Sequence, residues 1–149
     1  MTKYHYPALA VDVIIEQDDR LLLIKRKNEP FKFLYAIPGG FINECELVEA
    51  AAVREIREET SVDIILLDIL GVYSKPNRDP RGHVISVVFV GKITSGVPKA
   101  GDDAGSYEWL RINDLTDNKI AFDHINILDD YRRWKVSKGT YWSSKQQRV

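Results

Sequence analysis

Three glutamates crowd into the heptad REIREET, which spans residues 54–60. If this segment is a helix, Glu55, Glu58 and Glu59 stand at positions i, i+3 and i+4, so their carboxylates share one stripe. Mutual repulsion disfavours such a stripe by about a few tenths of a kcal/mol per pair when nothing neutralises it. One interpretation is a solvated helix face, on which the two arginines of the heptad partly neutralise the acids. The other is a binding site for a hard divalent cation, which prefers oxygen ligands.

The residues around the heptad favour the cation site. Gly39 and Gly40 predict a tight turn ahead of the helix, where a free backbone carbonyl can serve as a further oxygen ligand. Turn-rich loops farther along the chain supply additional acidic residues. Because Mg²⁺ bridges protein carboxylates to phosphate oxygens, a cation would turn the repulsive stripe into a site for a phosphate-containing substrate.

The flanking sequence predicts the elements that position these acids. Runs of β-branched and aliphatic residues predict strands, and 3.6-residue periodicity predicts two substantial helices. The predicted strands cover residues 8–16, 20–26, 34–37, 62–73, 83–93 and 107–112, and the predicted helices begin near Cys45 or Glu46 and near Asp123. The strand at 62–73 should be bent or bulged, because its polar residues do not alternate cleanly.

The order of these elements indicates an α/β fold with a mixed sheet. A doubly wound array would need a helix after nearly every strand, and only two substantial helices are predicted. A mixed sheet with helices on both faces fits better. The inner face of the first helix is predicted to be Ala52, Val53, Ile56 and Thr60. That of the second is predicted to include Ile125, Leu128, Tyr131 and either Trp134 or Lys135.

The composition is that of one compact globular domain. With 149 residues, of which 44% are apolar, the chain can bury a core without structural metals or disulfides. We therefore expect a single domain over residues 1–149, with a frayed polar tail of roughly 12 residues. The formal charge of −1 gives no general basic field, so no nucleic-acid partner is expected.

Two further features bear on location. No stretch reaches the roughly 18 apolar residues of a membrane span, so we expect a soluble protein with no membrane partner. The single Cys45 can form no internal disulfide, which suits a reducing compartment. We therefore expect a cytoplasmic location.

The spacing of residues from Gly40 to Val62 resembles the Nudix box. The family pattern is G-x5-E-x7-R-E-U-x-E-E-x-G-U, with U an aliphatic residue, and this chain matches every defined position except one. The departure is Ser61, where the family usually has glycine. If that position takes a positive φ after the helix, serine costs about 1 kcal/mol there, but its presence removes no metal ligand.

The resemblance implies a Nudix-type α/β/α sandwich around a mixed β-sheet. It also implies hydrolysis, dependent on Mg²⁺ or Mn²⁺, of a nucleoside diphosphate linked to another moiety. Carried over to this chain, it makes Glu55 and Glu59 direct metal ligands and Glu58 a third or water-mediated ligand. The backbone carbonyl of Gly39 or Gly40 would complete the shell.

Two other box residues are given supporting roles by the same resemblance. Arg54 would pair with the box carboxylates and hold them in register. Glu46 would be structural, at the start of the helix where the helix dipole favours an acid.

Three segments outside the box resemble one branch of the family. They are KRKNEPFKFLYAIPGGF at residues 25–41, GVYSKPNRDPRGHVIS at 71–86 and AFDHINIL at 121–128. These segments are similar to ADP-ribose pyrophosphatases related to the Nudix domains of NAD metabolism. The resemblance covers roughly residues 8–130 and implies cleavage of ADP-ribose to AMP and ribose 5-phosphate. It also implies a homodimer, because members of this branch often build each substrate site from two subunits.

Basic residues near these segments are candidates for substrate binding. Arg78, Arg81 and His83 carry donors suited to a diphosphate or to the terminal ribose. The alternative is that they are loop charges paired with Asp79. Arg26, at the end of the second predicted strand, is a further phosphate candidate.

Aromatic and capping residues leave more than one interpretation open. Phe31 or Phe41 could stack on adenine, although a single aromatic residue is more often part of a core or a lid. Asp123 and His124 are better explained as caps of the last helix than as directly catalytic residues, because Asp is a favoured N-cap residue.

Hydrolysis also needs a carboxylate that acts as the base and accepts a proton from the attacking water. Asp103 is the first candidate and Asp102 the second, because both lie in a loop just before a predicted strand. The alternatives are a solvated turn, which Asp and Gly favour, and a box glutamate acting as the base.

Two rival functions use the same residues. The first is a house-cleaning (d)NTP pyrophosphatase, which would release inorganic diphosphate. The second is a non-catalytic ADP-ribose-sensing module, whose relatives carry a winged-helix DNA-binding segment. The stretch after the last predicted helix is too short for such a segment and every box carboxylate is present, so we expect catalysis.

Overall fold

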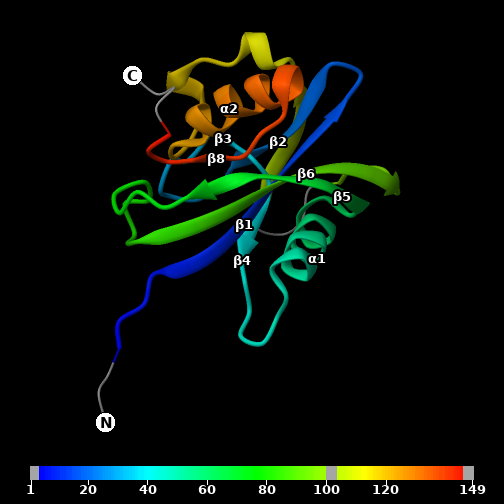
Figure 1. The fold of residues 1–149 in the computed structure, drawn as a ribbon. Coiled ribbons are helices and arrows are strands. Elements are labelled where there is room, and N and C mark those ends of the chain that lie inside the picture. The colour runs from blue at the N-terminus through cyan, green and yellow to red at the C-terminus, as the bar shows by residue number, and fades with distance from the viewer. Residues whose placement is uncertain (1–3, 100–103, 146–149) are drawn as a thin grey trace.

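The computed structural model describes residues 4–99 and 104–145, which form an α/β fold (Figure 1). The strands are β1 (Ala8–Gln17), β2 (Arg20–Arg26), β3 (Tyr35–Ala36), β4 (Gly39–Phe41), β5 (Asp63–Tyr73), β6 (Val84–Ser95), β7 (Ala104–Leu110) and β8 (Tyr141–Trp142). The α-helices are α1 (Val48–Thr60) and α2 (His124–Ser137), and two 3₁₀ turns cover Ile112–Asp114 and Asp117–Lys119. Within the described ranges, no helix is long and apolar enough to cross a membrane.

The sheet is mixed, as predicted. Its strands lie in the order β3-β2-β1-β6-β5-β8, with β4 paired to β1 and β7 paired to β2. Strands β1 and β6 are parallel, whereas β1 and β2 form an antiparallel hairpin. The predicted bends in β5 are present as register shifts along its pairing with β6. The mixed sheet brings the glycine strand β4 beside the middle of β1.

The predicted tight turn at Gly39 and Gly40 is wrong, because both residues belong to β4. Gly39 pairs with Asp12 and Gly40 with Val11 in an antiparallel register. A Cβ atom on Gly39 would lie 2.0 Å from the carbonyl oxygen of Val11. Glycine is therefore needed here for the close approach of two strands.

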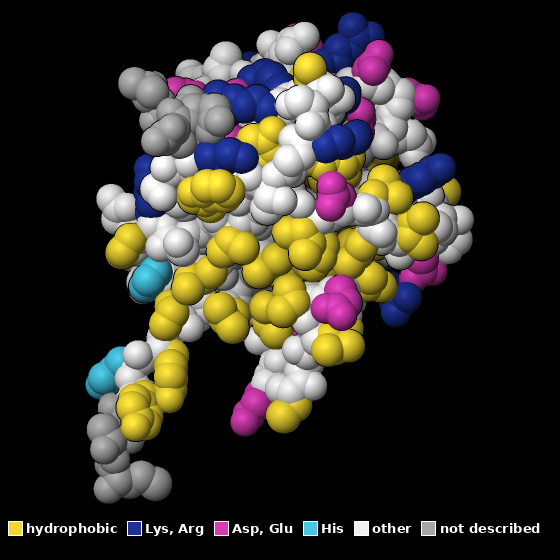
Figure 2. Space-filling view, viewed as in Figure 1, with side chains coloured by type: hydrophobic (Ala, Val, Ile, Leu, Met, Phe, Trp, Pro, Cys, Tyr) yellow, Lys and Arg dark blue, Asp and Glu magenta, His cyan; other side chains and the backbone are white. Residues whose placement is uncertain are grey.

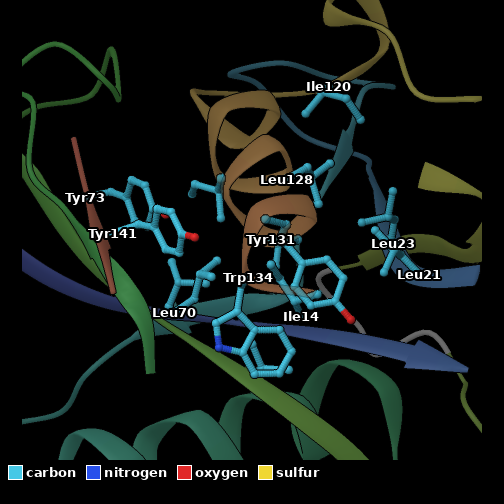
Figure 3. Close-up of a cluster of buried hydrophobic side chains, with 14 of the residues drawn as sticks. Ile14, Leu21, Leu23, Leu70, Tyr73, Ile120, Leu128, Tyr131, Trp134 and Tyr141 are labelled. Carbon is cyan, nitrogen blue, oxygen red and sulfur yellow. The ribbon is translucent and has the colours of Figure 1, made fainter. Parts of the chain in front are cut away.

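Helices α1 and α2 cover opposite faces of the sheet and create two cores. Alternation along β1 places Val11, Val13 and Ile15 in the core under α1, and Ile14 in the core under α2. Figure 3 shows the second core, in which Leu128, Tyr131 and Trp134 of α2 pack with side chains of the sheet. These three layers are the predicted α/β/α sandwich.

Helix α1 begins later than predicted. Its first helical residue is Val48, because Cys45 has a left-handed φ of 63° that is incompatible with a helix there. Among the predicted inner residues, Ala52, Ile56 and Thr60 are fully buried, whereas Val53 is half-buried.

Within the predicted frayed tail, the structure places a short strand. Tyr141 and Trp142 form β8 and pair in parallel with Gly71 and Val72 of β5. Burial of the Tyr141 ring in the α2 core anchors this strand. In α2 itself, the predicted inner residue Ile125 is half-buried, and Ile127 is fully buried instead.

Candidate active site

A pocket of about 560 Å³ opens between α1, the strands β1, β2 and β4, the loop at residues 74–83 and the start of α2. Glutamates from α1 and arginines from β2 and the loop line it. The pocket therefore combines anionic and cationic groups, as a site for a metal-bound phosphate requires.

Glu55 and Glu59 are the two box glutamates that line the pocket. Glu59 accepts a hydrogen bond of 3.1 Å from the backbone N–H of Gly39. A Cβ atom on Gly40 would lie 2.2 Å from the carboxyl group of Glu55, so only glycine lets this acid approach β4. Glu58 differs, because its side chain is 59% exposed and does not line the pocket.

Arg54 holds the acids of the box together. Its guanidinium lies 2.7 Å from Glu46, 2.8 Å from Glu55 and 3.1 Å from Glu58. It also donates a hydrogen bond of 3.0 Å to the backbone carbonyl of Phe41, next to β4's glycines. Arg54 thus fixes the position of α1 relative to β4.

Glu46 lies before α1 rather than at its first turn, so the predicted dipole role is wrong. It accepts hydrogen bonds from Arg54 and from the backbone N–H of Asn43. These bonds, that of Arg54 foremost, lower the pKa of Glu46 to about 2. Glu46 connects the β4–α1 loop to Arg54.

Burial strongly disfavours the charged forms of the pocket glutamates. It raises the pKa of Glu59 to about 8, with repulsion from Glu55 and Asp12 adding to the effect. Burial also raises the pKa of Glu55, against the opposing influence of Arg54. A nearby divalent cation would supply the positive charge that these oxygens lack.

The oxygen ligands available here fit a hard divalent cation that also binds water and substrate oxygens. Carboxylate oxygens of α1 and backbone carbonyls of β4 are the groups that Mg²⁺ and Mn²⁺ prefer. Among the described residues, no three acidic, histidine or cysteine side chains converge on a single metal position. A cation bound here would complete its coordination with water and substrate phosphate oxygens.

Asp12 was missed by the sequence analysis. It lies on β1, is only 8% exposed and lines the pocket. Its carboxylate accepts a short hydrogen bond from the Ser86 hydroxyl of β6. The available signal was one acid inside the apolar run ALAVDVIIE, which is unusual for a buried strand.

Arg26 and Arg81 form the cationic wall of the pocket. Both lie against the Phe122 ring, with guanidinium carbons 4.9 Å and 5.8 Å from its centroid. Arg81 also pairs with the buried Asp79 at 2.8 Å. Burial, and then repulsion from Arg81, lower the pKa of Arg26.

The other two predicted cations occupy different environments. Arg78 lines the pocket but is buried, and it forms two hydrogen bonds of 2.8 and 3.0 Å with Asp123. Its partner is thus Asp123 and not Asp79. His83 is exposed and does not line the pocket, and its Nε2 lies 3.0 Å from the carbonyl of Ser74.

The aromatic candidates also differ in position. Phe41 lines the pocket, with the guanidinium carbon of Arg81 5.7 Å from its ring centroid. Phe31 packs edge-to-face against Phe122, with 4.8 Å between ring centroids, and does not line the pocket. Phe122, which the sequence analysis did not single out, is therefore the aromatic residue at the centre of the cationic wall.

Neither Asp123 nor His124 caps α2 through its side chain. Asp123 occupies the N-cap position but bonds to Arg78 instead of a helix N–H. His124 is buried, and its Nδ1 accepts a hydrogen bond of 3.0 Å from the backbone N–H of Ile37. The two candidates for the base, Asp102 and Asp103, lie outside the described residues.

The fold and the pocket together define a site suited to metal-dependent phosphate hydrolysis. The chain matches the model of the NUDIX domain over residues 6–131 and belongs to that family. This match extends over the box, the pocket and most of α2.

Named relatives sharpen the comparison. The chain is 56% identical to an ADP-ribose pyrophosphatase of Methanocaldococcus jannaschii over 132 residues, covering 89% of this chain and 77% of that protein. It is 30% identical to the ADPR responsive transcriptional repressor NtrR of Acinetobacter baylyi, covering 84% of this chain but only 53% of the repressor.

A solved structure carries a ligand in the same fold. The NUDIX domain of Shewanella oneidensis NrtR, in complex with ADP ribose, superimposes with a TM-score of 0.78. It is 26% identical, and the match covers 89% of this chain and 91% of that domain.

Proposed function

We propose that this protein hydrolyses ADP-ribose to AMP and ribose 5-phosphate with the help of a divalent cation. The observation that carries the proposal is the 56% identity to an ADP-ribose pyrophosphatase, sustained over 89% of the chain. The pocket supports it, because half-buried glutamates of α1 and arginines line the same space of about 560 Å³.

The two walls of the pocket have different tasks in this reaction. Glu55, Glu59 and a backbone carbonyl of Gly39 or Gly40 would hold Mg²⁺ or Mn²⁺, which acts as a Lewis acid and lowers the pKa of a bound water. Arg26 and Arg81 would contact the diphosphate oxygens, whose negative charge grows during P–O cleavage.

The overall chemistry is a simple hydrolysis. A water molecule attacks one phosphorus, the bond from that phosphorus to the bridging oxygen breaks, and the water's proton goes to a nearby base. Asp103 stays our first prediction for that base and Asp102 the second, with a box glutamate as the alternative. Glu58 is the most exposed of the box glutamates, which suits contact with metal-bound water more than direct ligation.

The proposal is tested with Glu59→Gln. The isosteric amide keeps the shape of the side chain but loses its charge, so kcat/KM for ADP-ribose should fall by about 100-fold or more in either Mg²⁺ or Mn²⁺. The measurement is AMP release, assayed on ADP-ribose and on a panel of (d)NTPs. Glu49→Gln, at an exposed position in the first turn of α1, is the matched control and should keep full activity.

Three results would overturn the assignment. Full turnover by Glu59→Gln would remove this residue from the metal site. A 100-fold preference for a (d)NTP in kcat/KM, about 2.7 kcal/mol, would make the protein a nucleoside triphosphate pyrophosphatase. Tight ADP-ribose binding without turnover in either metal would make it a sensing module.

We also propose that the protein is a homodimer formed through the part of the sheet that α1 leaves open. Leu9, Ile69, Val72 and Trp142 are large apolar residues that are 40–48% exposed. Val72 pairs with Trp142 across β5 and β8, and Ile69 pairs with Phe89 of the α1-side core. Figure 2 shows hydrophobic side chains gathered over β5 and β6 on this face. Such a continuous patch favours a partner surface, and a second copy would cover both patches at once.

Val72→Glu tests the dimer. A charge at this position would have to be buried in the interface, so the protein should shift from dimer to monomer in multi-angle light scattering. Val136→Glu, at an 89% exposed site on α2, is the control and should leave the dimer intact. A monomeric wild-type protein at micromolar concentration, or a Val72→Glu protein that still dimerises, contradicts the proposal.

A further inference from the structure

Two buried polar side chains line the pocket in addition to the proposed metal ligands and phosphate contacts. Asp12 projects from β1 and His124 from the first turn of α2. They are 8% and 4% exposed, and both line the pocket. Burying two polar groups in this way is costly unless they are hydrogen-bonded, so their remaining hydrogen-bonding capacity points to a ligand.

Asp12 presents one free acceptor. Its Oδ2 accepts the hydrogen bond from Ser86. Its Oδ1 lies next to Gly39, because a Cβ atom added to that glycine would be 2.5 Å from this oxygen. No residue of the described ranges donates a hydrogen bond to Oδ1. Burial raises the pKa of Asp12, whereas His124, the Ser86 hydrogen bond and Arg78 act in the opposite direction and favour the ionised form. Ser86 fixes the orientation of the carboxyl group, and in the ionised form Oδ1 is left as an acceptor.

His124 presents one free donor. Its Nδ1 accepts from the backbone N–H of Ile37, so this nitrogen carries no proton and the hydrogen of the neutral ring is on Nε2. Burial lowers the pKa of His124, which favours the neutral form. Within residues 4–99 and 104–145, no group accepts a hydrogen bond from Nε2.

An aromatic ring, that of Phe122, lies beside His124. The Phe122 ring lines the pocket, with its centroid 5.3 Å from that of His124. Phe122 has a φ of 54°, a conformation that is strained for an aromatic residue and that the surrounding structure must hold in place. Arg26 and Arg81 lie over the same ring, so the two cations proposed to bind the diphosphate are close to His124.

We propose that Asp12 and His124 form a base-recognition subsite that selects a 6-aminopurine. The 6-amino group of adenine would donate to Asp12 Oδ1, and N7, which is an acceptor in both 6-aminopurines and 6-oxopurines, would accept from His124 Nε2–H. A 6-oxopurine places a carbonyl oxygen against the carboxylate and leaves Asp12 without a donor. This subsite rests on the proposed function, for which it identifies the residues that distinguish adenine from hypoxanthine.

Product binding tests the subsite without catalysis. In calorimetry, the wild-type protein should bind AMP at least about 10-fold more tightly than IMP, as one good pair of base contacts provides. In Asp12→Asn, the amide oxygen can still accept from Ser86 while the amide N–H₂ donates to the 6-oxo group. The preference for AMP should therefore fall below about 3-fold or reverse.

The matched control is Asp130→Asn. Asp130 is also a buried carboxylate, hydrogen-bonded to Tyr73 and Arg133, but it does not line the pocket. This variant should keep the full AMP preference. If Asp12→Asn fails to fold, His124→Gln is measured in its place. This variant retains one acceptor for Ile37 and one donor for the base, so it should keep the preference for AMP over IMP.

Kinetic measurements show whether the group that donates a hydrogen bond to Asp12 belongs to the base or to the terminal ribose. Asp12→Asn should change the ratio of kcat/KM for ADP-ribose over its inosine analogue by about 10-fold, and leave the ratio for ADP-ribose over ADP-glucose unchanged. The opposite result would mean that Asp12 reads the terminal ribose and would overturn the proposal. Equal affinity of the wild-type protein for AMP and IMP would also overturn it. Because AMP binding is measured without turnover, a protein that fails to hydrolyse ADP-ribose still gives a clear result for the subsite.

Discussion

At the scale of single residues, Glu59 is the acid whose charge depends most on what else is bound. Its pKa is raised to about 8 because the carboxyl is buried beside Glu55 and Asp12, and the Gly39 N–H only partly offsets this. A metal-free protein at neutral pH therefore keeps a proton on Glu59. A divalent cation has to displace that proton, so metal affinity should rise with pH up to about 8.

The same pKa predicts how stability depends on pH. The unfolded value is 4.5, so the folded state binds the proton more tightly, and this contribution to stability is full below about pH 4.5 and lost as pH rises through about 8. With EDTA present, the melting temperature should fall by several degrees between pH 5.5 and 8.5. Glu59→Gln cannot titrate there and should show a flatter curve. Parallel curves for the two proteins, followed by scanning calorimetry, would rule out this account.

At the scale of elements, contacts of Thr60 and Ser61 define where α1 ends. Thr60 is fully buried under the sheet, and its hydroxyl donates to the carbonyl of Ile56. Ser61 then takes a left-handed φ of 63°, with its backbone N–H bonded to the Arg57 carbonyl at 2.9 Å. The positive φ expected for this position of the box is therefore present, although serine occupies it.

Replacing Ser61 with glycine should stabilise the helix end. Glycine adopts a left-handed conformation without the steric cost of a Cβ atom, so we expect a gain of about 1 kcal/mol and a melting temperature about 2–4 °C higher. Ser61→Ala keeps the Cβ atom and should show no such gain, which makes it the control. Equal melting temperatures for the glycine and alanine variants would mean that the left-handed φ carries no strain.

At the scale of the whole molecule, a buried ion pair joins two segments that are far apart in the sequence. Arg78 comes from the β5–β6 loop and Asp123 from the residue before α2, and their side chains are 4% and 14% exposed. Arg78 also donates to the carbonyl of Val84 at 3.4 Å. The pair ties one wall of the pocket to the helix layer.

Breaking this pair from one side should be costly. Arg78→Met or Asp123→Asn should each lower the free energy of unfolding by about 3 kcal/mol, because a buried charge loses its partner. The double variant should cost at least about 1 kcal/mol less than the sum of the two. Urea unfolding measures all four proteins. The exposed pair Arg57–Asp63, with side chains 62% and 47% exposed, is the control, and its coupling should be below about 1 kcal/mol. Additive effects at the buried pair would show that the two charges do not depend on each other.

The sequence alone determined the features that depend on local spacing. The register of Glu55, Glu58 and Glu59 follows from helical periodicity, and the longer strands β1, β2, β5 and β6 follow from runs of apolar residues. The bulges in β5 were also predicted, because its polar residues break the alternation. Each of these signals lies within a dozen neighbouring residues.

Only the tertiary structure decided which residues share the pocket. Gly39 and Gly40 form a strand instead of a turn because β1 lies alongside, and no local signal specifies that pairing. Asp12, Phe122 and His124 line the same pocket although more than a hundred residues separate the first from the other two. Local periodicity shows on which face a residue lies, but the residue it meets there is determined by packing of the sheet and both helices.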